Sequence, residues 1–205
     1  MKRILIALLM VGIASAAVGG EKAEKAYPFQ LSLFSPVAIV SPDNSVNGLC
    51  LNLLYGANEN VRGLELGLVN QVKNDLSGYA FGVVNLVGGD VSGVQIGALN
   101  WTEGSIKGGQ GGLVNVAEGD AAVQGGFLNF AFSGTVSMQE GWLVNVGDKV
   151  DGLQLGLINV AKDISGFQFG AVNYTTDLMG LQIGILNFAM GKDSWKILPI
   201  VNAAW

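Results

Sequence analysis

Acidic side chains are the residues of this chain best able to do chemistry, because the sequence has no His and a single Cys. Six of them recur in short polar segments, where a shared edge would form a ridge able to bind divalent cations weakly: Asp90, Glu118, Asp120, Asp148, Asp163 and Asp177. The plainer interpretation, which we favour, is that they are solubilising turn residues. The absence of His excludes Ser-His-Asp catalysis, Cys-His catalysis and histidine metal sites. We therefore expect no metal and no cofactor.

Two further patterns match known sites only in part. Residues 108–112 read Gly-Gly-Gln-Gly-Gly, which resembles a phosphate-binding loop, but no Gly-Lys-Ser/Thr follows. Glu140 has no second carboxylate at a defined distance to act as its acid–base partner. It accompanies a one-residue insertion, which we interpret as a β-bulge. Neither pattern predicts an active site, so we expect a non-enzymatic protein.

These residues lie in copies of one short unit, Gly-apolar-Gln-apolar-Gly-apolar-apolar-Asn, as in residues 93–100 and 152–159. Its Asn recurs at a mean spacing of about 14.7 residues: Asn70, Asn85, Asn100, Asn115, Asn129, Asn145, Asn159, Asn173, Asn187 and Asn202. Its Gln also recurs, with Glu65 at the same place: Gln95, Gln110, Gln124, Gln154, Gln168 and Gln182. One unit upstream, Cys50 takes the Gln position and Tyr55 takes the Asn position.

Each unit has the composition of a β-strand closed by a polar turn. Nearly all charged residues between positions 56 and 190 lie after one Asn and before the next Gly; Glu65 and Glu140 are the exceptions. β-Branched and aromatic residues favour strands, and each internal Gly would cost a helix about 1 kcal/mol relative to Ala. The sequence therefore predicts an all-β fold built from short strands.

Two architectures fit this spacing. In a β-solenoid of about eleven coils of 14–16 residues, like residues stack about 4.8 Å apart, and the Asn and Gln amides form ladders. The alternative is an antiparallel outer-membrane β-barrel of about 12 strands, with a pore as its function. In such a barrel the Asn would alternate between two ends, and longer loops would be usual. The fixed place of the Asn and the uniformly short turns favour the solenoid.

The two ends of the chain depart from the repeat. Lys2 and Arg3, the apolar run that follows them and Ala14-Ser15-Ala16 form the pattern of a cleaved secretory signal peptide. At each of the two ends of the repeat array we expect an atypical unit that caps the open edge. The chain then divides into a signal peptide (1–16), an N-terminal leader and cap strand (17–47), a repeat domain (48–190) and a C-terminal cap (191–205).

Composition and charge narrow the choice of partner. With 16 acidic against 11 basic residues, the chain lacks the cationic face that a nucleic-acid partner needs. A hydrophobic content of 50% excludes disorder of the highly charged kind. Together with the signal peptide, this predicts an exported protein at the cell surface, in the outer membrane or in the periplasm. Its partner would be a surface or envelope component, and membrane association is one option.

The Gly-x-Gln-x-Gly-x-x-Asn repeat, together with the signal peptide, resembles the bacterial surface-repeat family first named from leptospiral proteins, over about residues 48–187. Members of that family are described by their location, as surface or exported proteins, so the resemblance implies a place and no activity. Some members look like lipoproteins, whereas no Cys for lipid attachment follows the apolar run here. We therefore expect an exported, non-enzymatic surface repeat protein with a structural or adhesive role.

Overall fold

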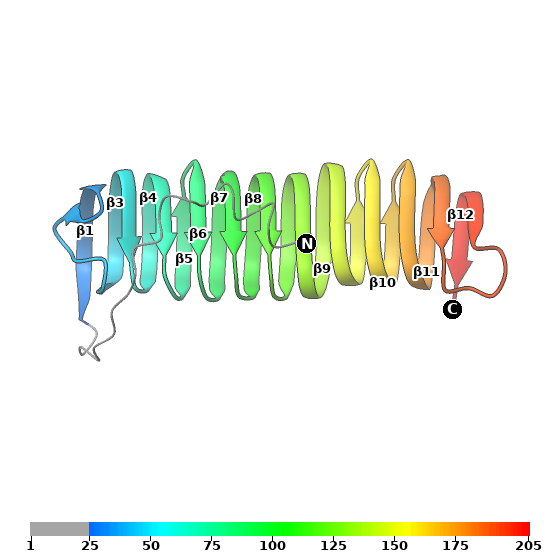
Figure 1. Ribbon diagram of the computed structural model, residues 1–205, viewed down its shortest axis with the longest axis horizontal. Helices are drawn as coiled ribbons and strands as arrows, with labels where there is room; N and C mark the ends of the chain where they lie inside the picture. The colour runs from blue at the N-terminus through cyan, green and yellow to red at the C-terminus, as the bar shows by residue number, and fades with distance from the viewer. Residues whose placement is uncertain (1–24) are drawn as a thin grey trace.

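The computed structural model describes residues 25–205, which form a straight rod of stacked coils (Figure 1). The strands are β1 (Ala26–Phe34), β2 (Val37–Ala38), β3 (Ser45–Asn58), β4 (Val61–Val72), β5 (Leu76–Phe81), β6 (Val84–Val87), β7 (Val91–Thr102), β8 (Ile106–Ala117), β9 (Ala121–Leu155), β10 (Ile158–Phe169), β11 (Val172–Ala189) and β12 (Ile197–Ala204). The predicted signal peptide and residues 17–24 of the leader lie outside the described residues. Among residues 25–205 there is no helix with the length and hydropathy needed to cross a membrane.

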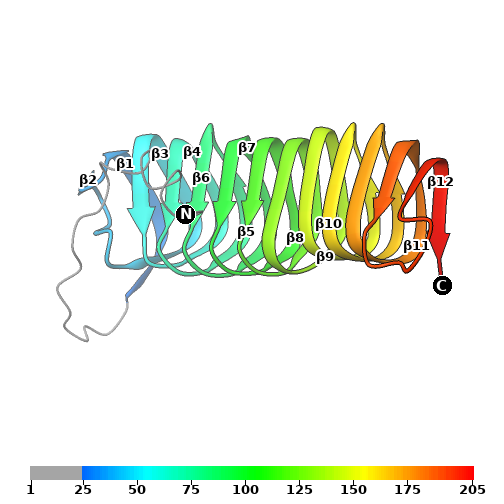
Figure 2. The same ribbon diagram turned by 45° about the vertical axis from the view of Figure 1, so that its right-hand side comes forward.

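Neighbouring coils pair in parallel, and like positions lie opposite each other. Between β10 and β11, for example, Asn159 pairs with Asn173 and Gln168 pairs with Gln182. The same parallel pairing continues from β3 to β11, and the turned view shows the coils following one another along one axis (Figure 2). The all-β solenoid of about eleven turns is thereby confirmed. The antiparallel alternative is wrong, because in it successive strands would run in opposite directions.

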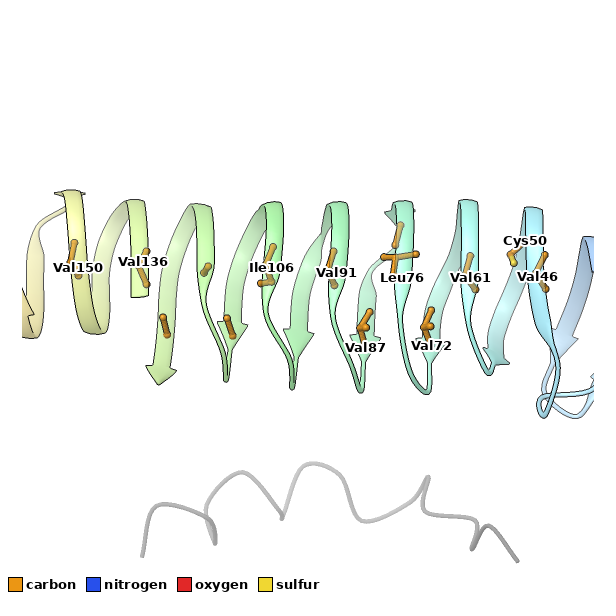
Figure 3. Close-up of a cluster of buried hydrophobic side chains, with 14 of the residues drawn as sticks. Val46, Cys50, Val61, Val72, Leu76, Val87, Val91, Ile106, Val136 and Val150 are labelled. Carbon is orange, nitrogen blue, oxygen red and sulfur yellow. The ribbon is translucent and has the colours of Figure 1, made fainter. Parts of the chain in front are cut away.

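Inward-facing side chains form four rows along the rod. One apolar row precedes the first Gly of each unit: Val46, Val61, Leu76, Val91, Ile106, Ala121, Val136, Val150 and Ile164. A second row of small or β-branched residues lies two places after the Asn: Val72, Val87, Thr102, Ala117, Ala131, Ala161, Thr175 and Ala189. Figure 3 shows members of both rows lined up along the coils. The Asn and Gln rows complete the interior, so about half of the core positions are amides.

Glycine is required where one coil lies directly against the next. Gly108 has φ +148°, a backbone conformation that L side chains rarely adopt. A Cβ there would lie 2.0 Å from the carbonyl oxygen of Gly93 in the preceding coil. The first Gly of the repeat therefore allows both this backbone conformation and the close approach between coils.

The N-terminal end is covered by an atypical strand, as predicted. In β1, Phe29 and Gln30 pair in parallel with Leu49 and Cys50 of β3, so β1 forms one more layer of the stack. The short β2 folds back on β1 in antiparallel fashion, and the amide of Gln30 exchanges hydrogen bonds of 2.8 and 3.1 Å with the backbone of Val40. This folded-back segment provides partners for polar groups that would otherwise face an open coil.

The C-terminal end is covered by a strand that reverses direction. β12 is antiparallel to β11, with Asn202 opposite Gln182 and Leu198 opposite Asn187. The prediction that Asn202 continues the Asn row is therefore wrong, although its spacing from Asn187 fits. The chain turns back after β11, and Ile200 has φ 68°, which is unusual for a β-branched residue and marks the irregular part of this cap.

Candidate functional site

The Asn side chains form one continuous row of hydrogen bonds. Each Nδ2 donates to the Oδ1 of the Asn in the next coil toward the C-terminus, at 2.8–3.0 Å, through Asn52, Asn70, Asn85, Asn100, Asn115, Asn129, Asn145, Asn159, Asn173 and Asn187. Most of these Nδ2 groups also donate to a backbone carbonyl of that coil, as Asn85 does to Ile96 at 3.0 Å. Both N–H groups of the amide are then used. The predicted Asn ladder is confirmed from Asn70 to Asn187.

The Gln side chains form a second row, and its hydrogen bonds run the opposite way. Each Nε2 donates to the Oε1 of the preceding coil, toward the N-terminus, at 2.7–3.0 Å, through Gln95, Gln110, Gln124, Gln139, Gln154, Gln168 and Gln182. Nearly all of them also donate to the carbonyl six or seven residues ahead, as Gln154 does to Val160. The amide dipoles of the two rows therefore oppose each other.

Gln139 is a ladder residue that the sequence analysis missed. It donates to Gln124 at 2.8 Å and accepts from Gln154 at 2.7 Å. Its spacing of 15 residues from each of them was the available signal. The signal was hidden because the inserted residue lies between Gln139 and Asn145, where it lengthens the Asn spacing and leaves the Gln spacing unchanged.

The Asn row begins at Asn52, and the assignment of Tyr55 to this row is wrong. The register shifts between these two residues, so that Tyr55 pairs with Val69 and Gly56 pairs with Asn70. The amide of Asn52 fills the place in front of Gly56, where a Cβ would lie 1.9 Å from its Oδ1. Gly56 pairs with Asn70 and so occupies the backbone position of the ladder Asn, while the amide of Asn52 takes the place of the missing side chain. The sequence signal for this arrangement was a Gly four residues after an Asn.

The Gln row is interrupted in the N-terminal coils. Cys50 and Glu65 lie in it as predicted, and Ala80 separates Glu65 from Gln95. Glu65 is fully buried, and its Oε1 accepts a hydrogen bond of 3.0 Å from Nδ2 of Asn52. Because Ala80 offers no polar group, Oε2 of Glu65 and Nε2 of Gln95 have no hydrogen-bond partner among the described residues.

Burial decides the protonation states of Glu65 and Cys50, the two titratable side chains in the interrupted part of the Gln row. It raises the pKa of Glu65 from 4.5 to about 8, although the hydrogen bond from Asn52 acts in the opposite direction. Burial also raises the pKa of the Cys50 thiol, and the nearby Glu65 carboxyl group raises it further. At neutral pH both groups are therefore uncharged, and Cys50 is not a reactive thiolate.

The turn carboxylates are engaged with the backbone. Oδ1 of Asp75 accepts from the N–H of Asp90, Oδ1 of Asp90 from Ser105, and Oδ1 of Asp120 from Thr135, at 2.7–2.8 Å. Side chains at one turn position thus receive the backbone N–H of the same position in the next coil. This is a structural use of Asp, and it fits the interpretation of these residues as turn formers.

The proposed acidic ridge is also broken up by other residue types. Asp163 and Asp177 pair in register, but Lys149 pairs with Asp163 on its other side, and Ser or Thr occupies the same position in other coils. Glu118 and Asp148 lie at other turn positions. A shallow depression of about 460 Å³ opens beside Lys149, Asp163 and Asp177. Within residues 25–205, no three or more Cys, Asp or Glu side chains come together as a metal site would require.

The Gly-rich residues 108–112 belong to strand β8 and are a variant of the repeat. Gly108 pairs with Gly93, and Gly112 pairs with Gly97, the two Gly positions of the preceding unit. A Cβ at Gly109 or Gly111 would meet its nearest neighbouring atom at 3.7 or 3.9 Å, an ordinary van der Waals contact. The segment is therefore a bare stretch of sheet and not a loop that could surround a phosphate.

The outside of the rod is apolar along one edge. The residue after the second Gly of the unit is an exposed hydrophobic side chain in most coils, and we call these residues the apolar ridge: Leu68, Val83, Leu113, Phe127, Trp142, Leu157 and Ile185. Their exposed fractions lie between 46% and 83%. The charged turns occupy the other end of the coil, so the rod has one apolar and one charged edge. An exposed apolar surface of this extent is typical of a contact site.

Comparison with known proteins identifies no relative. No family model matches the chain, and neither a curated protein nor a solved structure matches it.

Proposed function

We propose that the protein is an exported, non-enzymatic surface repeat protein with a structural or adhesive role in a bacterial envelope. Export is supported by the basic, apolar and Ala-x-Ala segments of residues 1–16. The surface location is supported by the resemblance of the repeat to the leptospiral-type surface-repeat family. The partner is a component of the envelope, and its lipid is the candidate that the surface of the rod favours.

The apolar ridge is the observation that carries the adhesive role. A repeat protein is stiff along its axis and offers an extended surface to a partner. Here that surface includes Trp142 and Ile185, whose side chains are 83% and 72% exposed. Burying one such side chain against lipid stabilises the contact by about 1.5–3 kcal/mol, so several along one line give firm attachment.

The non-enzymatic role is supported by what the polar side chains do. The Asn and Gln side chains that recur in the repeat hydrogen-bond to each other inside the rod. Asp75, Asp90 and Asp120 accept hydrogen bonds from backbone N–H groups. These groups are occupied in holding the coils together and are not collected around a substrate pocket.

Location is tested in living cells. The full chain is expressed with a C-terminal epitope in a Gram-negative host, and its N-terminus is sequenced after fractionation. We expect the mature protein to begin at Ala17 and to be digested by a protease added to intact cells. Uncleaved protein in the cytosol would overturn export, and protection from the protease in intact cells would overturn the surface location.

The adhesive role is tested with the purified mature protein and vesicles of phosphatidylethanolamine and phosphatidylglycerol. We expect the protein to sediment with the vesicles, and the double variant Leu113→Ser, Trp142→Ser to bind at least tenfold more weakly. The control is Glu103→Ser, on the charged edge, which should bind as the unaltered protein does. Equal binding by all three proteins would show that the ridge is not the contact surface, and no binding by any would remove lipid as the partner.

A further inference from the structure

The apolar surface of the rod continues from the apolar ridge onto both sides of each coil. In the coil that contains β5 and β6, Val83 lies on the ridge between the two strands. Tyr79 and Phe81 point outward from β5, and Val84 and Leu86 point outward from β6, where they alternate with buried residues. The two strand segments of a coil therefore form two outward faces that meet at the ridge.

Both faces are apolar along nearly the whole repeat array. We call the rows directly before and after the Gln position the Gln face; from Leu64 to Ile183 it contains one charged side chain, Glu140. We call the rows directly before and after the Asn the Asn face; from Val69 to Phe188 it contains no charged side chain. The charged turns lie at the far end of each coil from the ridge. Apolar side chains thus cover two faces and the edge between them.

We propose that the rod inserts edge-first into one leaflet of a phospholipid bilayer. The apolar ridge points toward the bilayer centre, the Gln face and the Asn face contact acyl chains, and the charged turns remain in water. This insertion rests on the lipid attachment proposed above and adds an orientation and a depth to it. A protein docked on one face would leave the other face exposed, whereas fluid acyl chains cover both faces and the ridge at once.

The height of the apolar surface matches the thickness of one leaflet. Its outermost rows lie three residues from the ridge at Leu86 on the Asn face and four residues from it at Tyr79 on the Gln face. At about 3.3 Å per residue, the apolar surface is about 13 Å high. The hydrocarbon core of a bilayer is about 30 Å thick, or about 15 Å for each leaflet. A rod inserted this far brings its charged turns to the level of the headgroups.

The charged turns determine the direction of the rod axis. They recur along the repeat array, with Asp75, Asp90 and Asp120 as examples. A rod that crossed the bilayer end-on would carry several of these side chains into the hydrocarbon, where a charge is costly. The axis therefore lies parallel to the plane of the membrane, and every coil of the array contacts the same leaflet.

The backbone at the ridge is suited to hydrocarbon, which offers no hydrogen-bond partner of its own. The N–H of Val83 donates to the carbonyl of Leu68 at 2.9 Å, and the carbonyl of Val83 accepts from the N–H of Leu99 at 3.0 Å. The carbonyl of Phe81 accepts from Nδ2 of Asn70 at 3.0 Å. These groups are hydrogen-bonded from coil to coil, as in the strands, and need no water.

Tryptophan fluorescence tests the depth and the orientation, because Trp142 lies on the ridge and Trp101 lies on the Asn face. Three single-Trp proteins, with Phe at the other Trp positions, retain Trp142, retain Trp101 or carry Phe169→Trp on the Gln face. Each is mixed with vesicles of phosphatidylethanolamine and phosphatidylglycerol whose acyl chains are brominated near the middle or near the end, since bromine quenches a nearby indole. We expect the emission of all three to fall by roughly twofold or more, and bromine near the chain end to quench Trp142 most strongly.

The matched control is a single-Trp protein with Glu103→Trp, on the charged edge, whose emission should stay the same. Circular dichroism confirms that each protein folds, and sedimentation with the vesicles confirms that it is bound. Quenching of Trp142 alone, or of one face without the other, would overturn edge-first insertion while leaving lipid attachment in place. Failure of the unaltered protein to sediment would overturn the attachment itself, and the insertion with it.

Glu140 provides a second test that does not depend on Trp substitutions. Its side chain is exposed on the Gln face, two residues before Trp142. Insertion brings it below the headgroups, where a negative charge opposes binding. We expect Glu140→Gln to bind the vesicles about tenfold more tightly than the unaltered protein, whereas Glu103→Gln, on the charged edge, should bind as the unaltered protein does. Equal affinities of the two variants would overturn the insertion of the Gln face.

Discussion

Replacing Glu65 with Gln should remove a pH dependence of stability that this one side chain creates. Glu65 occupies a place that Gln occupies in other coils, is fully buried, and has one carboxyl oxygen without a partner among the described residues. In the other coils the Gln Nε2 donates to a carbonyl six or seven residues ahead. A Gln at position 65 can make the same bond to the carbonyl of Gln71 while still accepting from Asn52.

The sign and size of the effect follow from the pKa. The pKa of Glu65 is raised from 4.5 to about 8 in the folded protein, chiefly by burial. Between these two values the unfolded chain loses its proton and the folded chain keeps it, so the free energy of unfolding falls as the pH rises. The contribution is fully present below pH 4.5 and is lost by about pH 8. At about 1.4 kcal/mol per pH unit, the whole window amounts to about 5 kcal/mol.

Urea unfolding at pH 4, 6 and 8, followed by circular dichroism, measures this effect. We expect the difference in unfolding free energy between Glu65→Gln and the unaltered protein to change in favour of the variant by about 5 kcal/mol from pH 4 to pH 8. Glu103→Gln, at an exposed turn, is the control and should follow the unaltered protein. Parallel pH profiles for Glu65→Gln and the unaltered protein would refute the reasoning, because they would mean that Glu65 is ionised in the folded state.

Two further pairs of variants compare the stability cost of changing an inward-facing residue with that of changing a surface residue. Gly126→Ala should destabilise the rod by roughly 3 kcal/mol or more, because its Cβ would lie 1.9 Å from the Gly112 carbonyl oxygen, whereas Gly125→Ala, with nothing within 4 Å, should be neutral or stabilising by up to about 1 kcal/mol. Thermal melts of the two variants measure the difference, and similar melting temperatures would contradict the packing argument. Asn115→Leu should cost roughly 3–5 kcal/mol, because it leaves buried amides of two coils without partners, while Asp120→Ala loses one exposed hydrogen bond of about 1 kcal/mol. Urea titrations compare them, and equal midpoints would count against the stacked amides.

The fold could be predicted because the repeat is marked by Asn residues, whose regular spacing is compatible with few arrangements of the strands. An Asn every 14–16 residues can stack only if successive coils are parallel and in register, and the sequence alone favoured the solenoid on this ground. The Gly positions and the placing of Cys50 and Glu65 in the Gln row followed from the same alignment.

The sequence analysis was wrong where the spacing of a residue along the chain no longer corresponds to its position in the coil. Tyr55 has the spacing of a ladder residue, but a register shift gives its place to the amide of Asn52. Asn202 also has the right spacing, but the reversed strand β12 puts it opposite Gln182. A count along the chain cannot detect a change of strand direction or a side chain that reaches across from another position. The caps and the first coil are where such changes occur.

The distribution of polarity in this rod explains why a chain of such high hydropathy needs an amide core. A coil of about fifteen residues encloses a narrow interior, and apolar side chains of similar size could slide past one another between coils without penalty. Asn and Gln cannot, because a slipped register leaves buried amides without partners, at about 1–3 kcal/mol for each group. The two ladders run in opposite directions, so their dipoles compensate as the rod lengthens. The interior thus fixes the register with polar groups, and within residues 25–205 most Leu, Phe and Ile side chains, which contribute to the mean hydropathy of +0.44, lie at least partly on the outer surface. The binding role that we propose therefore rests on that surface and not on the core.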